Sequence, residues 1–215
     1  MNQLTTILLR IGIVAIALVV WFWTQRLIAL KATSEDKIGD RLHEWTASLH
    51  GWFLVNPKAA DATLIVTSAL IDLFGLFLVG ATIFGPTSRP FLALLLVFSL
   101  RQLCQAICSL PYPDRPIWRN PGFPSLLVTY GTSNDFFFSG HTSIAMIGAL
   151  EIAQVAPPWL AVVAVCVAIL EAATVIVLRA HYTIDVFAAV FAAWASEFVA
   201  TRWAPVVDLW FSRIG

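Results

Sequence analysis

The sequence predicts an all-α polytopic membrane protein, a single domain of residues 1–215 with six transmembrane helices and one interfacial amphipathic helix. Of the 215 residues, 59% are hydrophobic and 12% are charged, whereas an average soluble domain is about 45–50% apolar and about 25% charged. The mean hydropathy of +0.82 points the same way. This composition excludes a soluble globular enzyme and a disordered chain, and the net charge of zero excludes a basic nucleic-acid binder.

Six segments have the length and hydropathy of membrane spans, since each holds about 20 mainly apolar residues, enough to cross about 30 Å of hydrocarbon. The first is interpreted as an anchor and not as a signal peptide, because Trp21, Trp23 and Arg26 follow its apolar core in place of a cleavage site. The predicted spans cover residues 6–30, 60–84, 90–110, 136–155, 159–178 and 182–203.

The charged stretch of residues 34–53, between the first two spans, has helical periodicity. Its apolar residues recur every three or four positions, which is the spacing of one helix face. We therefore expect an amphipathic helix lying in the headgroup layer. His43 and His50 flank that apolar face and are predicted to be interfacial side chains, not ligands.

Residues 111–135 are predicted to form an active-site loop. Five prolines between residues 111 and 124 exclude a helix or a central strand. Trp118, Phe123 and Tyr130 favour an ordered lid at the membrane surface. Long loops of this kind are usually functional or disordered.

Two histidines are predicted to lie at one membrane face. The fourth and sixth spans both begin where the third ends, so His141 and His181 share that side. Asp185 follows His181 by four residues, which stacks the two on one helix face. A carboxylate there can accept the Nδ1 proton and leave Nε2 as a nucleophile. His141 would serve as general acid and base.

An anion site is predicted beside these histidines. Ser139 and Gly140 precede a helix, whose first N–H groups and positive dipole end suit a phosphate oxygen. Arg101 and Arg179 could grip the phosphate bidentately. For both arginines the alternative is ordinary interfacial snorkelling.

Four acidic residues fall inside the predicted spans. Glu171, about two turns before Arg179, could reach the reaction chamber or could serve in interhelical packing. Asp72 is a candidate partner of Arg101. Glu151 and Glu197 fall toward the opposite face, where a structural role is expected.

Two short motifs carry a resemblance to a known family. The strings S-G-H-T at residues 139–142 and H-Y-T-I-D at residues 181–185 resemble the lipid phosphate phosphatase (PAP2) superfamily. Within it, the sequence is similar to the sphingomyelin synthase branch, which includes plant phosphatidylcholine:diacylglycerol cholinephosphotransferases. Asp135, six residues before the first histidine, and Arg101, in a span ending in Leu-Pro, match that branch as well. The resemblance covers most of residues 101–190.

The resemblance implies a phosphotransferase that moves a phosphoalcohol headgroup, phosphocholine by preference, from a phospholipid donor to a lipid alcohol, diacylglycerol or ceramide. It implies that His181 forms a phosphohistidine, that Asp185 orients it, and that His141 is the acid and base. It implies no metal, no other cofactor and no nucleic-acid partner. The implied phosphate contacts are Arg101, Arg179, Ser139 and Gly140. The residues expected to support the site are Asp135, Tyr182 and Glu171.

Two departures from the family pattern bear on the activity. Thr174 and Val175 stand where the phosphatase branch has a Ser-Arg pair, which favours a transferase over a lipid phosphatase or phospholipase C-type hydrolase. Ser133 and Asn134 replace a Cys-Gly pair, which leaves diacylglycerol and ceramide both open as acceptor. A non-catalytic lipid-binding membrane protein is the remaining alternative.

The expected location is a multi-pass integral membrane protein of a bacterial inner membrane or of an endoplasmic reticulum or Golgi type membrane. The distribution of Lys and Arg in the loops favours a cytoplasmic active site, whereas the resemblance favours an exoplasmic or lumenal one. Tyr112, Trp118 and Tyr182 could hold a quaternary ammonium group by cation–π contact or could be ordinary interfacial aromatics.

Overall fold

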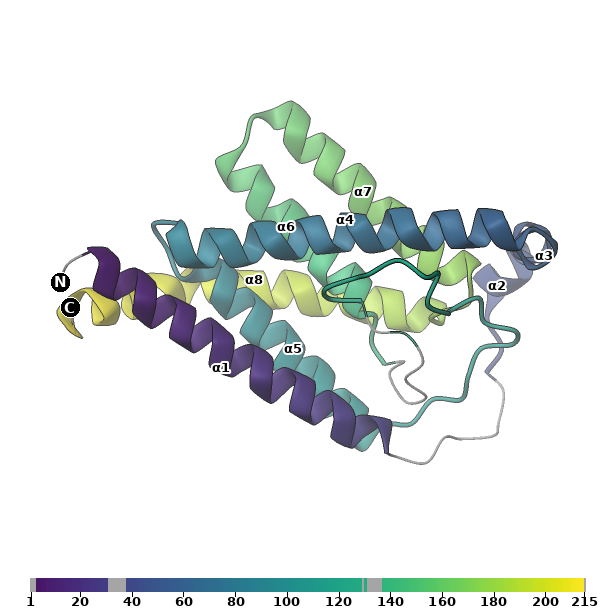
Figure 1. Cartoon of the computed structure of the whole chain (residues 1–215), viewed down its shortest axis with the longest axis horizontal. Helices are drawn as coiled ribbons and strands as arrows, with labels where there is room; N and C mark the ends of the chain where they lie inside the picture. The colour runs from purple at the N-terminus through teal and green to yellow at the C-terminus, as the bar shows by residue number, and fades with distance from the viewer. Residues whose placement is uncertain (1–2, 31–37, 129, 131–136, 215) are drawn as a thin grey trace.

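The computed structural model describes residues 3–30, 38–128, 130 and 137–214, and all regular secondary structure in these ranges is helical. Figure 1 labels the helices. Their bounds are α1 Gln3–Ala29, α2 Arg41–Trp45, α3 Ala47–Val55, α4 Pro57–Phe84, α5 Arg89–Ile107, α6 Gly140–Val155, α7 Pro158–Val177 and α8 Thr183–Ile214.

Five of these helices, α1, α4, α5, α7 and α8, are long and apolar enough to cross a membrane by length and composition. The all-helical prediction is confirmed, whereas the count of six spans is not, because the fourth predicted span, residues 136–155, is only partly realised. Its helix α6 has 16 residues, about 24 Å at 1.5 Å rise per residue. It begins at Gly140 because Ser139 caps it, and Pro157 and Pro158 follow its end.

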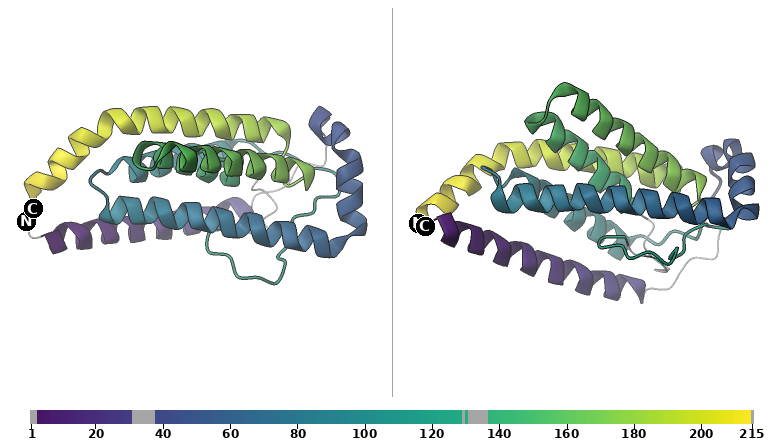
Figure 2. Two further views of the ribbon diagram at one scale, coloured as in Figure 1. Left: turned by 90° about the horizontal axis from the view of Figure 1, so that it is seen from above. Right: turned by 45° about the horizontal axis from the view of Figure 1, so that its top comes forward.

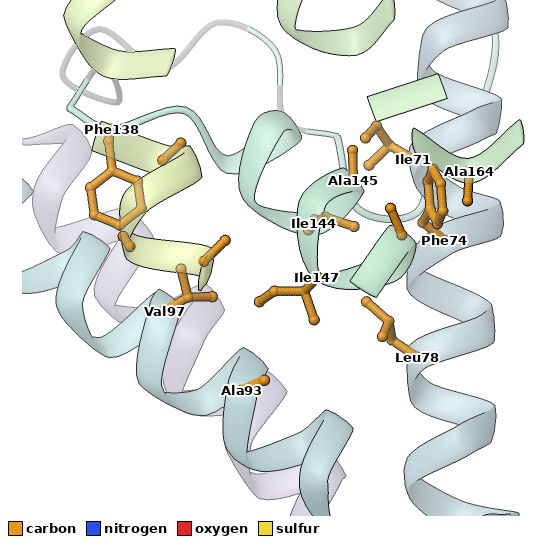
Figure 3. Packing of buried hydrophobic residues seen from close by; sticks show 14 of the residues in the cluster. Ile71, Phe74, Leu78, Ala93, Val97, Phe138, Ile144, Ala145, Ile147 and Ala164 are labelled. Carbon is orange, nitrogen blue, oxygen red and sulfur yellow. The ribbon is translucent and has the colours of Figure 1, made fainter. Parts of the chain in front are cut away.

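The core of the molecule is built around α6, which packs against α4, α5, α7 and α8. Figure 3 shows Ile144, Ala145 and Ile147 of α6 between side chains of α4 and α5. Both chain ends lie together at one end of the molecule, and α2 and α3 lie at the other (Figures 1 and 2). Because α6 contacts α4, α5, α7 and α8, this short central helix is supported on several sides by long helices.

The predicted amphipathic helix of residues 34–53 is divided in two, and residues 34–37 lie outside the described ranges. The helix α2 begins after Asp40, whose Oδ1 accepts the N–H groups of Leu42 and His43 at 3.0 and 3.2 Å. Thr46 separates α2 from α3. The helical periodicity continues across this break, which is why the sequence pattern alone indicated one helix.

The end of the bundle near the chain termini is held by a buried ionic network. Arg89 of α5 donates from Nε and Nη2 to the two carboxylate oxygens of Glu151, at 2.9 and 2.6 Å, and its Nε lies 3.3 Å from Oε1 of Glu197. Gln154 bridges to Glu197 at 3.1 Å. The network joins α5, α6 and α8, which agrees with the structural role expected for the two glutamates.

The hypothesis that Asp72 pairs with Arg101 is wrong. The Asp72 carboxylate accepts the backbone N–H groups of Leu126 and Leu127, both at 2.9 Å. Those residues belong to the long loop, which returns alongside α4. The intramembrane acid thus fixes the loop through backbone donors that sequence spacing cannot indicate.

Candidate active site

The predicted histidine–carboxylate pair lies where α8 begins, but His181 precedes the helix by two residues and only Asp185 stands in its first turn, so the two do not share a helix face as predicted. His181 Nδ1 lies 3.6 Å from Oδ2 of Asp185, and both side chains are buried. The same Oδ2 accepts the backbone N–H of Tyr182 at 2.9 Å. The distance to the imidazole exceeds that of an ordinary N–H···O hydrogen bond, so a small movement completes the bond. The carboxylate is thereby held on the Nδ1 side of the ring.

The beginning of α6 is tied to this turn of α8. The Ser139 N–H donates to the Asp185 carbonyl at 3.2 Å, which brings the S-G-H-T and H-Y-T-I-D motifs to the same end of the molecule. The Ser139 hydroxyl accepts from the Thr142 N–H at 3.3 Å and from the Thr142 hydroxyl at 3.1 Å. Ser139 therefore uses its side chain as a helix cap, and His141 stands in the first turn of that helix.

Arg101 reaches the same helix start from α5. Its side chain is buried, with 3% of the residue exposed, and Nε donates to the Phe138 carbonyl at 2.7 Å. A Cβ atom at Gly140 would lie 3.4–3.7 Å from the guanidinium, at ordinary van der Waals distance, so Arg101 lies directly against the start of α6. When the Gln25 amide is oriented with its oxygen toward these donors, it accepts from Arg101 Nη1 at 2.9 Å. Arg101 and the N-terminus of α6 together form a positive region beside the histidines.

Arg179 is directed elsewhere. Its backbone is left-handed, with φ of 55°, and Nη1 donates to the Asp114 carbonyl at 3.0 Å. Among the described residues this hydrogen bond goes to the loop after α5 and not to either histidine. Its role as a phosphate contact stays a prediction that needs the side chain to turn.

The loop after α5 packs against the candidate site. Ile117 N–H donates to the Leu178 carbonyl at 2.8 Å, which fastens the loop to the end of α7. The Trp118 ring meets His141 edge-on, with centroids 5.0 Å apart, and lies 5.1 Å from Tyr130. Figure 1 shows the loop beside the beginnings of α6 and α8. The part of the loop that the structure describes thus positions an aromatic ring on one of the two histidines.

His43 and His50 correct a second sequence interpretation, because neither is an exposed interfacial side chain. They are 8% and 2% exposed. His43 Nε2 lies 3.0 Å from the His181 carbonyl oxygen, and His50 Nδ1 lies 2.9 Å from that of Val177. The two histidines are seven residues apart, about two helical turns, so they point in the same direction. This spacing could have indicated that both contact the same segment, which is residues 177–181.

Asp40 supports the start of α8 from the other side. Its Oδ2 accepts the Thr183 N–H at 2.6 Å and its Oδ1 the Thr183 hydroxyl at 2.7 Å. Burial by itself raises the pKa of the Asp40 carboxyl, but these bonds and the His43 N–H outweigh it and hold the pKa below its ordinary value. Burial, with the charge of Arg179 nearby, lowers the pKa of His50. The segment before α4 thus binds the turn that carries His181 through Asp40, His43 and His50.

These motifs lie within the region matched by a family model. The model of the AtPDCT1/2 family, phosphatidylcholine:diacylglycerol cholinephosphotransferases (PDCT), matches residues 40–202, about three quarters of the chain. The chain belongs to the AtPDCT1/2 family. No curated protein and no solved structure gives a significant match. The matched region begins at Asp40 and includes both motifs, whereas α1 lies outside it.

In this PDCT-family protein, Tyr182 is buried and its ring stacks on His43 with centroids 5.6 Å apart. Burial raises the pKa of the Tyr182 hydroxyl. With 2% of the residue exposed, the Tyr182 ring offers almost no surface to a choline group. Of the three aromatic residues considered for cation–π contact, Tyr112 and Trp118 are the more accessible.

Glu171 is the other acidic group near the PDCT motifs. It is fully buried in α7, and neither carboxylate oxygen has a hydrogen-bond partner among the described residues. Asp135 lies outside the described residues. No group of three or more His, Cys, Asp or Glu side chains in the described part of the chain is arranged to hold a metal ion.

Proposed function

We propose that this protein is a multi-pass membrane phosphatidylcholine:diacylglycerol cholinephosphotransferase that works through a phosphohistidine on His181. The observation that carries the proposal is the backbone bond between Ser139 and Asp185, because it joins the helix start bearing His141 to the His181–Asp185 pair. The family match over residues 40–202 supports the substrates. Placement of the chain in the PAP2 superfamily belongs to the same proposal and is supported by the two motifs.

In the first step, His181 Nε2 attacks the phosphorus of phosphatidylcholine. The N–P bond forms, the bond from phosphorus to the diacylglycerol oxygen breaks, and His141 donates the proton that this oxygen needs. Asp185 stabilises the ring as it becomes positive. Arg101 and the first N–H groups of α6 balance the charge that develops on the phosphoryl oxygens.

In the second step, a different diacylglycerol occupies the vacated place. His141, now neutral, removes the proton from its hydroxyl, the new oxygen attacks phosphorus, and the N–P bond breaks. His181 and His141 return to their starting protonation states. The Trp118 ring against His141 keeps that imidazole in one orientation for both proton transfers.

The alternatives are distinguished by the acceptor. Water in place of the second alcohol gives a phospholipase C-type hydrolase, and ceramide gives a sphingomyelin synthase. Dry surroundings favour a lipid alcohol, since His181 and Asp185 are both buried beneath the loop and α2.

The test uses the purified full-length chain in vesicles with choline-labelled phosphatidylcholine and a diacylglycerol of different acyl composition. We expect labelled phosphatidylcholine carrying the new acyl chains, and no such product from His181→Ala. Free phosphocholine as the main product, or sphingomyelin formed faster from ceramide, would overturn the diacylglycerol assignment. Donor labelled with radioactive phosphorus should leave an acid-labile label on the wild-type protein, and its absence during steady turnover would contradict the covalent step.

A further inference from the structure

An apolar cavity of about 380 Å³ lies between α1, α4 and α5. Nearly all of its wall is aliphatic or aromatic, with Ala17 and Trp21 on α1, Gly75 on α4 and Phe98 on α5 among the lining residues. Ligand pockets in proteins have volumes of about 300–1,000 Å³. The cavity is therefore large enough to accept part of a lipid.

The cavity extends from the candidate active site toward the opposite end of the bundle. One end is lined by Gln102, next to Arg101, and by Ile144, three residues after His141, whereas the other end is lined by Thr82 and Phe91. The distance from Gln102 to Phe91 along α5 is about 16 Å at 1.5 Å rise per residue. All three walls are helices able to cross a membrane, so the cavity lies at the depth of the acyl chains.

Polar contacts hold α1 at both ends of this cavity. Near the histidines, Thr24 donates to Gln102 Oε1 at 2.6 Å and Gln25 contacts Arg101. Near the chain termini, Arg10 donates to the Gly85 carbonyl at 2.6 Å. Figure 2 shows α1 along the outside of the bundle. The helix is thus fastened at its ends, while its middle forms one wall of an apolar space.

We propose that this cavity binds one acyl chain of the phosphatidylcholine donor, with α1 as its outer wall and the donor phosphate at Arg101. The side chains that line this partly open apolar space lack dispersion contacts when nothing fills it, and a hydrocarbon chain supplies them. The donor is favoured over diacylglycerol because Gln102 at one end of the cavity directly follows the buried Arg101, whose guanidinium attracts an anionic phosphate and not a neutral glycerol.

The inference rests on the proposed function for the identity of the donor. It goes beyond the family match, because α1 lies outside residues 40–202. It assigns to α1 a share of the donor site, in which Gln25 connects the wall of the chain pocket to the arginine at the headgroup.

The site can be mapped with a photoreactive phosphatidylcholine that carries a diazirine at the end of one acyl chain. Full-length protein in vesicles should be labelled within residues 13–21 of α1 and residues 91–102 of α5. His181→Ala, which binds but does not react, should give the same pattern. Labelling spread over the outer face of α7, or stronger labelling of the cavity by a photoreactive diacylglycerol, would overturn the proposal.

A matched pair of variants on α1 tests the cavity further. Ala17 lines the cavity, whereas Ala15 is exposed and does not. We expect Ala17→Trp to reduce cavity labelling by long-chain donor about tenfold, which corresponds to roughly two buried methylene groups, and to affect a dihexanoyl donor much less. Ala15→Trp should match the wild type. Equal losses in both variants, or with both donors, would contradict the chain site.

The two proposals fail in different ways. Cavity labelling without transfer to diacylglycerol would overturn the proposed activity and leave the chain site standing. Transfer to diacylglycerol with labelling outside the cavity would overturn the chain site and leave the proposed activity standing.

Discussion

The buried charged groups at the two ends of the bundle have different partners. Near the chain termini, Arg89 is surrounded by Glu151, Gln154 and Glu197, and its guanidinium forms a bidentate pair with Glu151. Near the histidines, both oxygens of Glu171 and Oδ1 of Asp185 have no hydrogen-bond partner among the described residues, and at the other end Oε2 of Glu197 likewise has none. Buried polar groups are nearly always satisfied when they only support a fold. The two ends therefore differ in their cations: Arg89 forms a bidentate pair with Glu151, whereas no described arginine or lysine pairs with the buried Glu171.

The largest expected effect is that of His181→Ala, which should lower cholinephosphotransfer at least about 10³-fold by removing the nucleophile. Thermal unfolding should change little, since the backbone contacts of the turn remain. His50→Ala is the matched control, because His50 is equally buried but bonds a backbone carbonyl. It should lose stability and keep its rate per folded molecule. If the two variants exchanged these behaviours, the assignment of the active end would be wrong.

Asp185→Asn should lower the transfer rate about 10²-fold, because an amide no longer fixes the histidine tautomer or stabilises its positive form. The KM for phosphatidylcholine should stay near the wild-type value. Steady-state kinetics in vesicles with varied donor measure both quantities. An unchanged rate with a raised KM would show that Asp185 serves binding and not the nucleophile.

Truncation of the two buried glutamates compares the two ends directly. Glu151→Ala should lower the free energy of unfolding by about 3 kcal/mol, because it leaves a buried arginine without its main partner. Glu171→Ala creates a similar cavity but breaks no described ion pair, so its loss should be about 2 kcal/mol smaller. Chemical unfolding in detergent micelles measures the difference. Equal losses would mean that Glu171 has a stabilising partner comparable with Arg89.

A smaller effect is expected on acidification. The folded-state pKa of Asp40 lies below its ordinary value of 3.8. Its ionised form therefore stabilises the fold above that value, and the contribution is lost as the pH falls through the folded pKa. Asp40→Asn should remove about 1 kcal/mol at neutral pH and flatten the decline in stability below pH 5 relative to wild type. Unfolding measured across this range tests the prediction, and parallel declines in both proteins would contradict it.

The amino-acid sequence by itself determined the features that depend on local spacing and composition. Its apolar runs indicated the helical membrane class, and the four-residue step from His181 to Asp185 indicated that the two side chains meet, although only Asp185 is helical. The Ser-Gly step before His141 likewise indicated where α6 begins. These features follow from the helical repeat and the chemistry of caps, which act within a few residues.

Only the tertiary structure decided which distant groups meet. It buried His43 and His50 against the turn before α8, gave Asp72 the backbone of the loop in place of Arg101, and turned Arg179 toward Asp114. Each of these contacts joins residues more than 50 positions apart, where periodicity carries no information. They are set by how the five long helices pack with the shorter α2, α3 and α6, because packing, not spacing, determines which buried donor finds which acceptor.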